Sequence, residues 1–123
     1  MTVERLSLGK EGELFAVKYL KKQGYKIKEQ NYNTPVGEID IIALDGKTIV
    51  FIEVKTRQSI CYGSPFEAVN HRKQRQIQKT ALYYLGSKKV KNKALRFDVL
   101  SLYMDGEKWQ AQLIQNAFEV SSF

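Results

Sequence analysis

EIDIIALDGKTIVFIEVKT, residues 38–56, is the stretch that decides the fold of this chain. The runs Glu38 to Ala43 and Thr48 to Thr56 are rich in Ile and Val, and this composition predicts two strands. Asp45-Gly46 lies between them and indicates a tight hairpin, because a type I′ turn needs positive φ at both central residues. We therefore expect an antiparallel pair of strands at the centre of the fold.

The flanking sequence predicts helices on both sides of this hairpin. Gly24 is a natural stop for the first helix. A second helix is expected to begin at Ser64, with Asn70 as a point where it can break and restart, and to end at Gly86. The order of elements is a helix, three strands, a helix and two strands, which predicts an α/β fold with one mixed sheet and flanking helices. The other expected elements are a helix from Ser7 to Gln23 and strands at Tyr25 to Asn31, Leu95 to Tyr103 and Lys108 to Phe118.

Length and composition limit the class of protein. The 123 residues fit a single domain, residues 1–123, and 43% hydrophobic with 27% charged residues is a globular balance. No apolar run approaches the ~20 residues that a membrane span needs. The lone cysteine, Cys61, has no partner for an internal disulfide. We expect a cytoplasmic protein with no membrane contact.

The net charge of +7 is concentrated in one segment. Asn70 to Arg96 contains nine Lys and Arg and no Asp or Glu. A concentrated basic surface suits a polyanion such as DNA or RNA. The alternative is a lysine-rich surface that only keeps the protein soluble.

Acidic residues in the hairpin indicate a candidate metal-binding site. If Asp45-Gly46 forms the turn, Asp40 lies opposite Phe51 and diagonal to Glu53, with the two acids roughly 7–8 Å apart at the backbone. Residues two apart on a strand share a face, so Lys55 is expected beside them. Two such carboxylates can hold Mg²⁺, and a neighbouring lysine can orient the attacking water. The alternative is an ordinary half-exposed strand.

These same residues resemble a known family. Gly37 to Asp40 (GEID) followed by Glu53 to Arg57 (EVKTR) resembles the PD-(D/E)XK nuclease signature, with Ile39 in place of its proline. From Gly9 through Val99 the chain resembles the YraN-like bacterial proteins, distant relatives of archaeal Holliday-junction resolvases. The resemblance implies a restriction-endonuclease-like fold and a Mg²⁺ or Mn²⁺ cofactor. It also implies that Asp40 and Glu53 are metal ligands and that Lys55 is the catalytic lysine.

Two helix residues are further candidates for the site. Glu13 lies on the helical face of Ala16 and Leu20, where a carboxylate is costly unless paired. It resembles the helix glutamate that related resolvases place at the metal; the alternative is a helix-start carboxylate favoured by the helix dipole. Gln74, on the face of Ile77, can hold a water or phosphate in the site, or it is an amide satisfied near the core edge.

Nucleic-acid contacts are expected from basic residues of the second helix and the loop that follows it. Contacts of this kind give affinity and salt dependence but no sequence preference. The loop lysines are the stronger candidates, because a loop can adapt to a backbone. The candidates in these two segments are Arg72, Lys73, Arg75, Lys79, Lys88, Lys89, Lys91 and Lys93. Arg57, which continues the face of Glu53 and Lys55, is a further candidate.

Three functions remain open on the sequence. The first is a Mg²⁺- or Mn²⁺-dependent endonuclease acting on DNA, with branched DNA as a candidate substrate and a homodimer suggested by analogy with resolvases. The second is a nucleic-acid-binding module that does not cut; the retained set of Asp40, Glu53 and Lys55 argues against it. The third is a basic protein that binds RNA or a ribosomal particle, whose binding would be unaffected by Asp40→Asn or a chelator.

Overall fold

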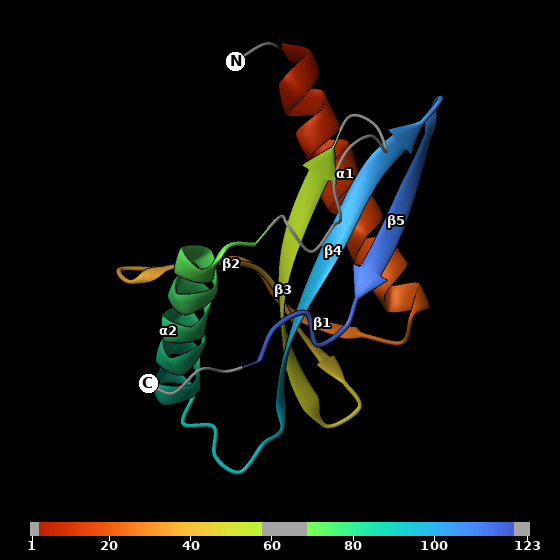
Figure 1. Ribbon diagram of the computed structural model, residues 1–123. Coiled ribbons are helices and arrows are strands. Elements are labelled where there is room, and N and C mark those ends of the chain that lie inside the picture. Colours follow the sequence, from red (N-terminus) through yellow and green to blue (C-terminus); the bar gives the residue numbers. More distant parts are fainter. Residues whose placement is uncertain (1–2, 58–68, 120–123) are drawn as a thin grey trace.

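The structure is a computed structural model that describes residues 3–57 and 69–119; side chains are described for all of these except residues 3–8 and 57 (Figure 1). The elements follow the predicted order of a helix, three strands, a helix and two strands. They are α1 Val3–Lys22, β1 Lys26–Thr34, β2 Gly37–Asp45, β3 Thr48–Arg57, α2 His71–Ser87, β4 Leu95–Asp105 and β5 Lys108–Ile114.

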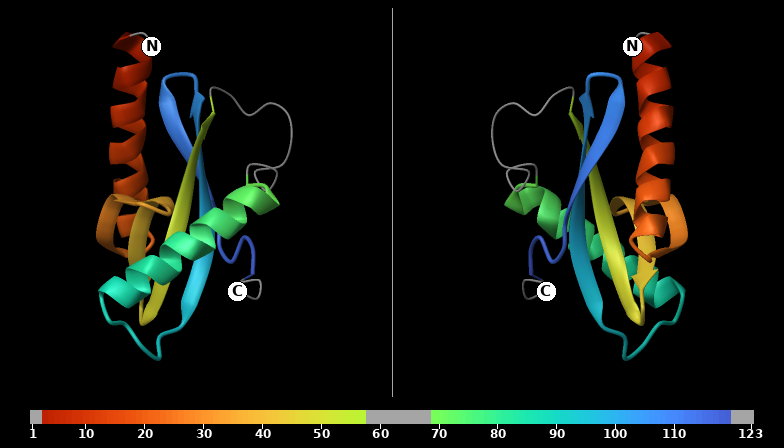
Figure 2. Two further views of the ribbon diagram at one scale, coloured as in Figure 1. Left: turned by 90° about the vertical axis from the view of Figure 1, so that its left-hand side faces the viewer. Right: turned by 90° about the vertical axis from the view of Figure 1, so that its right-hand side faces the viewer.

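The strands form one five-stranded mixed sheet in the order β1-β2-β3-β4-β5. Only β3 and β4 run parallel, with α2 in the connection between them, and the other neighbours are antiparallel. The helices α1 and α2 cover opposite faces of the sheet (Figure 2). The predicted α/β class is confirmed, and the architecture is consistent with a restriction-endonuclease-like fold. No helix among the described residues is long and apolar enough to cross a membrane.

The core has two parts, one under each helix, because successive side chains of a strand point to opposite faces. In β3, Ile49 and Phe51 face α2, whereas Val50 and Ile52 face α1. Each such side chain contributes roughly 1.5–3 kcal/mol through burial. We call the first part the α2-side cluster, with Ile39, Ile42, Ile49, Phe51, Val69, Ile77, Ala81, Tyr84, Phe97 and Val99. The α1-side cluster holds Ala16, Leu20, Tyr25, Ile41, Ala43, Val50, Ile52, Leu100 and Leu102.

The hairpin between β2 and β3 turns one residue later than the sequence predicted. Asp45 pairs with Thr48, so the turn residues are Gly46 and Lys47. Of these only Gly46 has positive φ, at 61°, which fits a turn with glycine at its first central position. Asp45 remains in the strand, where its carboxylate forms a 2.9 Å ion pair with Arg96 of β4. This ion pair favours the observed register over the predicted one.

The corrected register changes the neighbours of Asp40. Ile42, rather than Asp40, lies opposite Phe51, and regular pairing of β2 with β3 stops at Ile41. Continuing the same register brings Asp40 directly opposite Glu53, not diagonal to it as predicted. The two acids therefore lie where the ladder between β2 and β3 ends.

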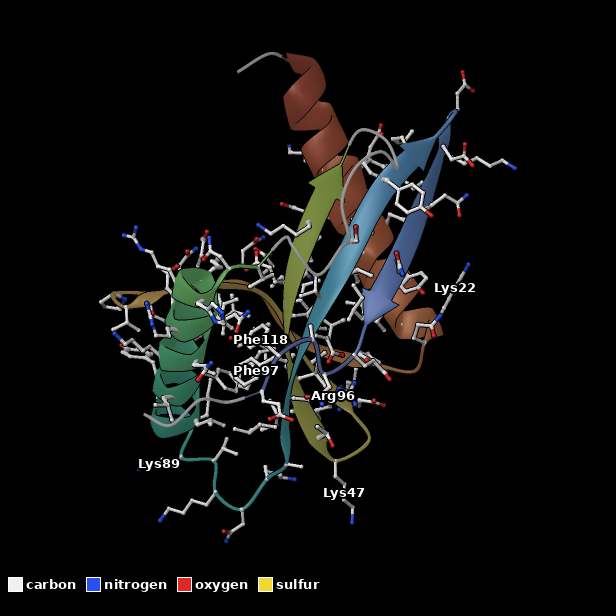
Figure 3. The ribbon with its side chains drawn as sticks, viewed as in Figure 1. Lys22, Lys47, Lys89, Arg96, Phe97 and Phe118 are labelled. Carbon is white, nitrogen blue, oxygen red and sulfur yellow. The ribbon has the colours of Figure 1, made fainter. Side chains whose placement is uncertain are left out.

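Two further element ends differ from the prediction, and a third confirms it. The helix α1 begins at Val3 rather than Ser7, and it stops as expected at Gly24 (φ 94°), where Tyr25 N donates to Leu20 O. The strand β5 ends at Ile114, short of the predicted Phe118. The chain turns away after β5 because Ala117 N donates to Phe97 O, and Phe118 then stacks on Phe97 at 5.0 Å (Figure 3).

The predicted restart of the second helix at Asn70 is observed, and α2 begins there. Asn70 caps the helix, and its Oδ1 accepts a 2.9 Å hydrogen bond from Lys73 N. The expected start at Ser64 lies outside the described residues. This cap fixes Lys73 in the first turn of α2, which matters for the site.

Candidate metal and nucleic-acid site

The alternation of faces along β2 breaks at Asp40. Ile41 and Ala43 belong to the α1-side cluster and Ile42 to the α2-side cluster, as regular alternation requires. The same alternation would place Ile39 on the α1 side, but Ile39 belongs to the α2-side cluster. Asp40 lies within this irregular step. The sequence could not reveal the break, because a residue pattern alone reads as continuous alternation.

The Asp40 carboxylate is held by the backbone of β3. Its Oδ2 accepts a 2.7 Å hydrogen bond from Val54 N. In an uninterrupted ladder the N–H groups of β3 would bond to carbonyls of β2, so the side chain replaces a backbone acceptor where the strands separate. One carboxylate oxygen is thereby fixed, and the group is positioned without needing a second side chain.

The predicted common face for the three site residues is only partly correct. Glu53 and Lys55 continue the face of Phe51, toward α2, whereas Asp40 lines a pocket on the α1 side. The carboxyl group of Asp40 nevertheless meets that of Glu53 in a hydrogen bond. They meet because the strands separate here and leave room at the end of the ladder.

Glu53 is a buried carboxyl group with a raised pKa. Its side chain is 9% exposed, and its Oε2 lies 3.6 Å from Nζ of Lys73. Burial raises the pKa of Glu53 to about 7, helped by the hydrogen bond and negative charge of Asp40 and opposed by Lys73 and Lys55. Glu53 therefore retains its proton to higher pH than an ordinary glutamate, because its ionised form would lie buried beside the negative charge of Asp40. A divalent cation can take the place of that proton.

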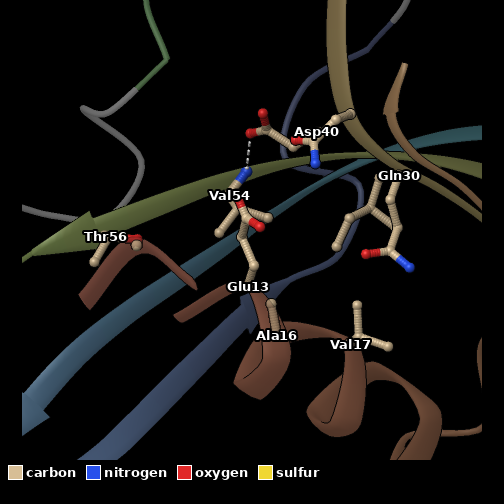
Figure 4. A pocket seen from close by; sticks show the side chains of 10 residues that line it. Glu13, Ala16, Val17, Gln30, Asp40, Val54 and Thr56 are labelled. Atoms are coloured by element: carbon tan, nitrogen blue, oxygen red, sulfur yellow. Dashed lines mark hydrogen bonds between the residues drawn. The ribbon is translucent and has the colours of Figure 1, made fainter. Parts of the chain in front are cut away.

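Glu13 approaches the same place from α1. A pocket of about 180 Å³ separates α1 from the end of the β2–β3 ladder, and Glu13, Asp40 and Val54 all line it. Figure 4 shows the Glu13 side chain extending from α1 toward Val54 and Asp40. The other lining residues are Gly9, Ala16, Val17, Gln30, Asn31, Ile41 and Thr56.

The donor set suits a cation that needs few protein ligands. Among the described residues no three His, Cys, Asp or Glu side chains are grouped closely enough to hold a metal together. Asp40 and Glu53 therefore form a pair, with the exposed Glu13 across the pocket rather than in contact. Mg²⁺ accepts such a pair, because waters and phosphate oxygens complete its octahedron.

The amide of Gln74 is used for structure. Its Nε2 donates a 3.0 Å hydrogen bond to Val69 O, the residue before the cap of α2. This geometry favours the alternative of a satisfied amide over a direct role in the site. Its neighbour Lys73, predicted only as a phosphate contact, is the residue that reaches Glu53. The sequence signal for this was the Asn70 cap, which places Lys73 in the first turn.

The expected basic residues divide into two groups at opposite ends of the sheet. Arg72 and Arg75 are exposed near the start of α2, beside the residue that contacts Glu53, and Lys79 is exposed further along. Together with Val36, Asn70, Lys73 and Gln76 they line an open groove. This group is close enough to the carboxyl pair to hold the same nucleic acid.

The loop lysines lie away from the carboxyl pair. The loop precedes β4, and β4 starts beside Ile49 at the opposite end of β3 from Lys55 (Figure 1). Glu53 lies four positions after Ile49 in β3, about 13 Å along the strand. The loop lysines are Lys88, Lys89, Lys91 and Lys93; the side chain of Arg57, the remaining candidate, lies outside the described residues.

Arg96, the last basic residue of the segment, is engaged within the fold. Its guanidinium bonds to Asp98 at 2.9 and 3.0 Å and pairs with Asp45. Tyr25 joins the same network, since its hydroxyl donates to Asp98 at 2.8 Å and accepts from Arg96 at 2.6 Å. The charge of Arg96 therefore stabilises the sheet, and the basic surface consists of the other residues.

Comparison with known proteins yields one family. The model of "Uncharacterised protein family UPF0102" matches residues 12–102. A UPF0102 protein of Geobacter metallireducens is 50% identical over 121 residues, which cover 98% of this chain and 99% of the relative. A UPF0102 protein of Syntrophotalea carbinolica is 43% identical over the whole of both chains. Another, of Caldicellulosiruptor saccharolyticus, is 46% identical and covers 94% of this chain and 100% of the relative.

Proposed function

This chain belongs to protein family UPF0102, the predicted YraN-like bacterial family, and we propose that it is a divalent-metal-dependent nuclease. The observation that carries the proposal is the contact between the Asp40 and Glu53 carboxyl groups at the end of the β2–β3 ladder. A pair of acids of which one is buried and the other half-buried costs stability. A pair fixed by a backbone N–H and flanked by two lysines is better suited to bind a cation than to hold a sheet together.

Asp40 and Glu53 would hold Mg²⁺ or Mn²⁺ through their oxygens, with Glu13 as a further carboxylate facing the same pocket. The bound cation would supply the Lewis acidity that phosphodiester hydrolysis needs. The backbone of Val54 keeps Asp40 in place while this happens.

Two lysines serve different steps in this proposal. Lys55 shares the face of Glu53, and its charge favours the ionised form of that carboxyl group. From there it can orient the attacking water and stabilise negative charge on the phosphate. Lys73 pairs with Glu53 at 3.6 Å, so a cation at Glu53 would displace its ammonium group, which then becomes available to a phosphate oxygen.

The start of α2 would hold the nucleic-acid backbone. Arg72, Arg75 and Lys79 are exposed along the groove that begins at Lys73. Phosphate contacts of this kind position a strand without reading its sequence. DNA is the proposed substrate, and its phosphates would pass from this groove to the carboxyl pair.

A cleavage panel tests the proposal. Labelled linear duplex, flap, four-way junction and single strands, as DNA and as RNA, are incubated with Mg²⁺, Mn²⁺ or chelator. We expect metal-dependent cutting that is lost in Asp40→Asn and Lys55→Ala. The matched controls are Asp105→Asn, at the exposed end of β4, and Lys47→Ala, in the exposed β2–β3 turn, and both should cut normally. Binding without cutting, equal in all variants, would instead identify a non-cleaving nucleic-acid-binding module.

A further inference from the structure

A second hollow lies on the other flank of α1, against β5. Its volume is about 400 Å³, and three aromatic rings line it in a row. Phe15 stacks on Tyr19 with centroids 6.2 Å apart and meets Trp109 edge-on at 6.3 Å. Leu14 at its rim is 64% exposed. We call this the aromatic groove; its lining is Glu11, Leu14, Phe15, Lys18, Tyr19, Lys22 and Trp109.

The charge around the aromatic groove selects its occupant. Lys18 and Lys22 are exposed at its rim, and Figure 3 shows Lys22 extending outward from the end of α1. Lys10 and Lys21 are exposed on the same helix. Glu11 is the one carboxylate in the lining, so the lysines leave this face positively charged. A symmetric dimer built on it would bring two such faces together, which disfavours a second copy. An anionic partner with flat apolar surfaces fits both the lysines and the rings.

The aromatic groove and the pocket lined by Glu13 and Asp40 lie on opposite flanks of one helix. At 100° per residue, Glu13 and Val17 point to the flank of the site pocket, and Phe15 and Tyr19 to the flank of β5. The outer surface between them carries Lys10 and Lys18. A helix is about 10–12 Å wide with its side chains, so a few nucleotides can cross from one flank to the other.

We propose that the aromatic groove binds an unpaired base, so that the preferred nucleic acid has a single-stranded segment beside its duplex. Bases stack on aromatic rings without regard to sequence, and lysines beside the rings hold the phosphates. The duplex would lie on the opposite face of the sheet, along the start of α2 (Figure 2). The placement of the carboxyl pair between the duplex and the unpaired strand rests on the proposed function. The binding of a base in the aromatic groove does not depend on it.

Trp109 makes a direct test possible, because it is the only tryptophan of the chain. The protein is titrated in chelator with a single-stranded oligonucleotide, a blunt duplex and a duplex carrying a single-stranded tail, while tryptophan fluorescence is recorded. We expect quenching by the single strand and the tailed duplex, with the tailed duplex binding most tightly. The blunt duplex should bind with little quenching.

Variants separate base stacking from general charge. Lys18→Gln with Lys22→Gln should weaken single-strand binding roughly tenfold, and Phe15→Leu should weaken it roughly five- to hundredfold. The charge-matched control is Lys28→Gln with Lys47→Gln, exposed lysines away from the groove. Thermal unfolding confirms that each variant is folded.

Three results would overturn the inference: equal quenching by blunt duplex, equal affinity of the lysine variant and its control, or Trp109 fluorescence that changes with protein concentration alone. The last would assign the groove to a second copy of the chain. Because chelator is present throughout, a protein that stacks bases but never cuts would retain this inference and refute only the proposed function.

Discussion

Replacing Glu53 by glutamine should change how stability depends on pH. In the metal-free protein the pKa of Glu53 is raised from 4.5 to about 7, so the folded state holds this proton more tightly than the unfolded chain. The resulting stabilisation is complete below pH 4.5 and is lost as pH rises through about 7. One pKa unit corresponds to about 1.4 kcal/mol, so the shift is worth about 3 kcal/mol.

The assay is urea unfolding in chelator between pH 4.5 and 8 for the wild type and Glu53→Gln. Glutamine cannot ionise, so the difference in free energy of unfolding between the two proteins should move by about 3 kcal/mol over this range, with the variant relatively more stable at pH 8. Glu107→Gln, an exposed carboxylate in the β4–β5 turn, makes the same change in charge without burial. Asp40→Asn should reduce the slope but keep part of it, because burial is the largest cause of the shift.

Metal addition provides the second half of this experiment. With Mg²⁺ in large excess at pH 8 the wild type should gain stability as RT ln(1 + [Mg²⁺]/Kd), and Glu53→Gln should gain much less. A stability difference between wild type and Glu53→Gln that stays flat with pH would refute the claim that Glu53 is a buried acid with a raised pKa.

Three further variants test the fold around the site, each by urea unfolding. Gly37→Ala should lower the free energy of unfolding more than Gly24→Ala does. A Cβ at Gly37 (φ 154°) would lie 2.6 Å from Thr80 Oγ1, whereas nothing lies within 4 Å of a Cβ at Gly24 (φ 94°). Equal losses of stability in the two variants would show that the contact with Thr80 is unimportant. Asn70→Ala should cost about 1 kcal/mol by removing the cap of α2, and an unchanged urea midpoint would contradict this. Tyr25→Phe should cost about 1–3 kcal/mol by removing the hydrogen bonds of the hydroxyl with the charged groups of Asp98 and Arg96. Because burial raises the pKa of Tyr25 to about 12, an absorbance titration of the variant should lose the phenolate step near pH 12, and a titration identical to wild type would count against this assignment.

The sequence determined the order of elements because each depends on local signals. Period-2 alternation of Ile and Val gave the strands, and Gly24 and Asn70 gave a helix end and a helix start. The GEID and EVKTR strings identified Asp40, Glu53 and Lys55 as candidates, since charged residues in strands of this kind are uncommon. These features need only neighbours a few residues away, so no tertiary information was required.

The geometry of the site was decided by tertiary contacts. The hairpin register depends on the ion pair of Asp45 with Arg96, which is distant in the chain. The break in β2 at Asp40 and the approach of Lys73 to Glu53 follow from how β3 and α2 pack together. Likewise, the loop lysines, which the sequence predicted as the stronger phosphate contacts, lie at the end of β3 away from Glu53, because β4 runs parallel to β3. The sequence fixes residue types and periods, but which side chains meet depends on register and packing, which are set by contacts between residues far apart in the chain.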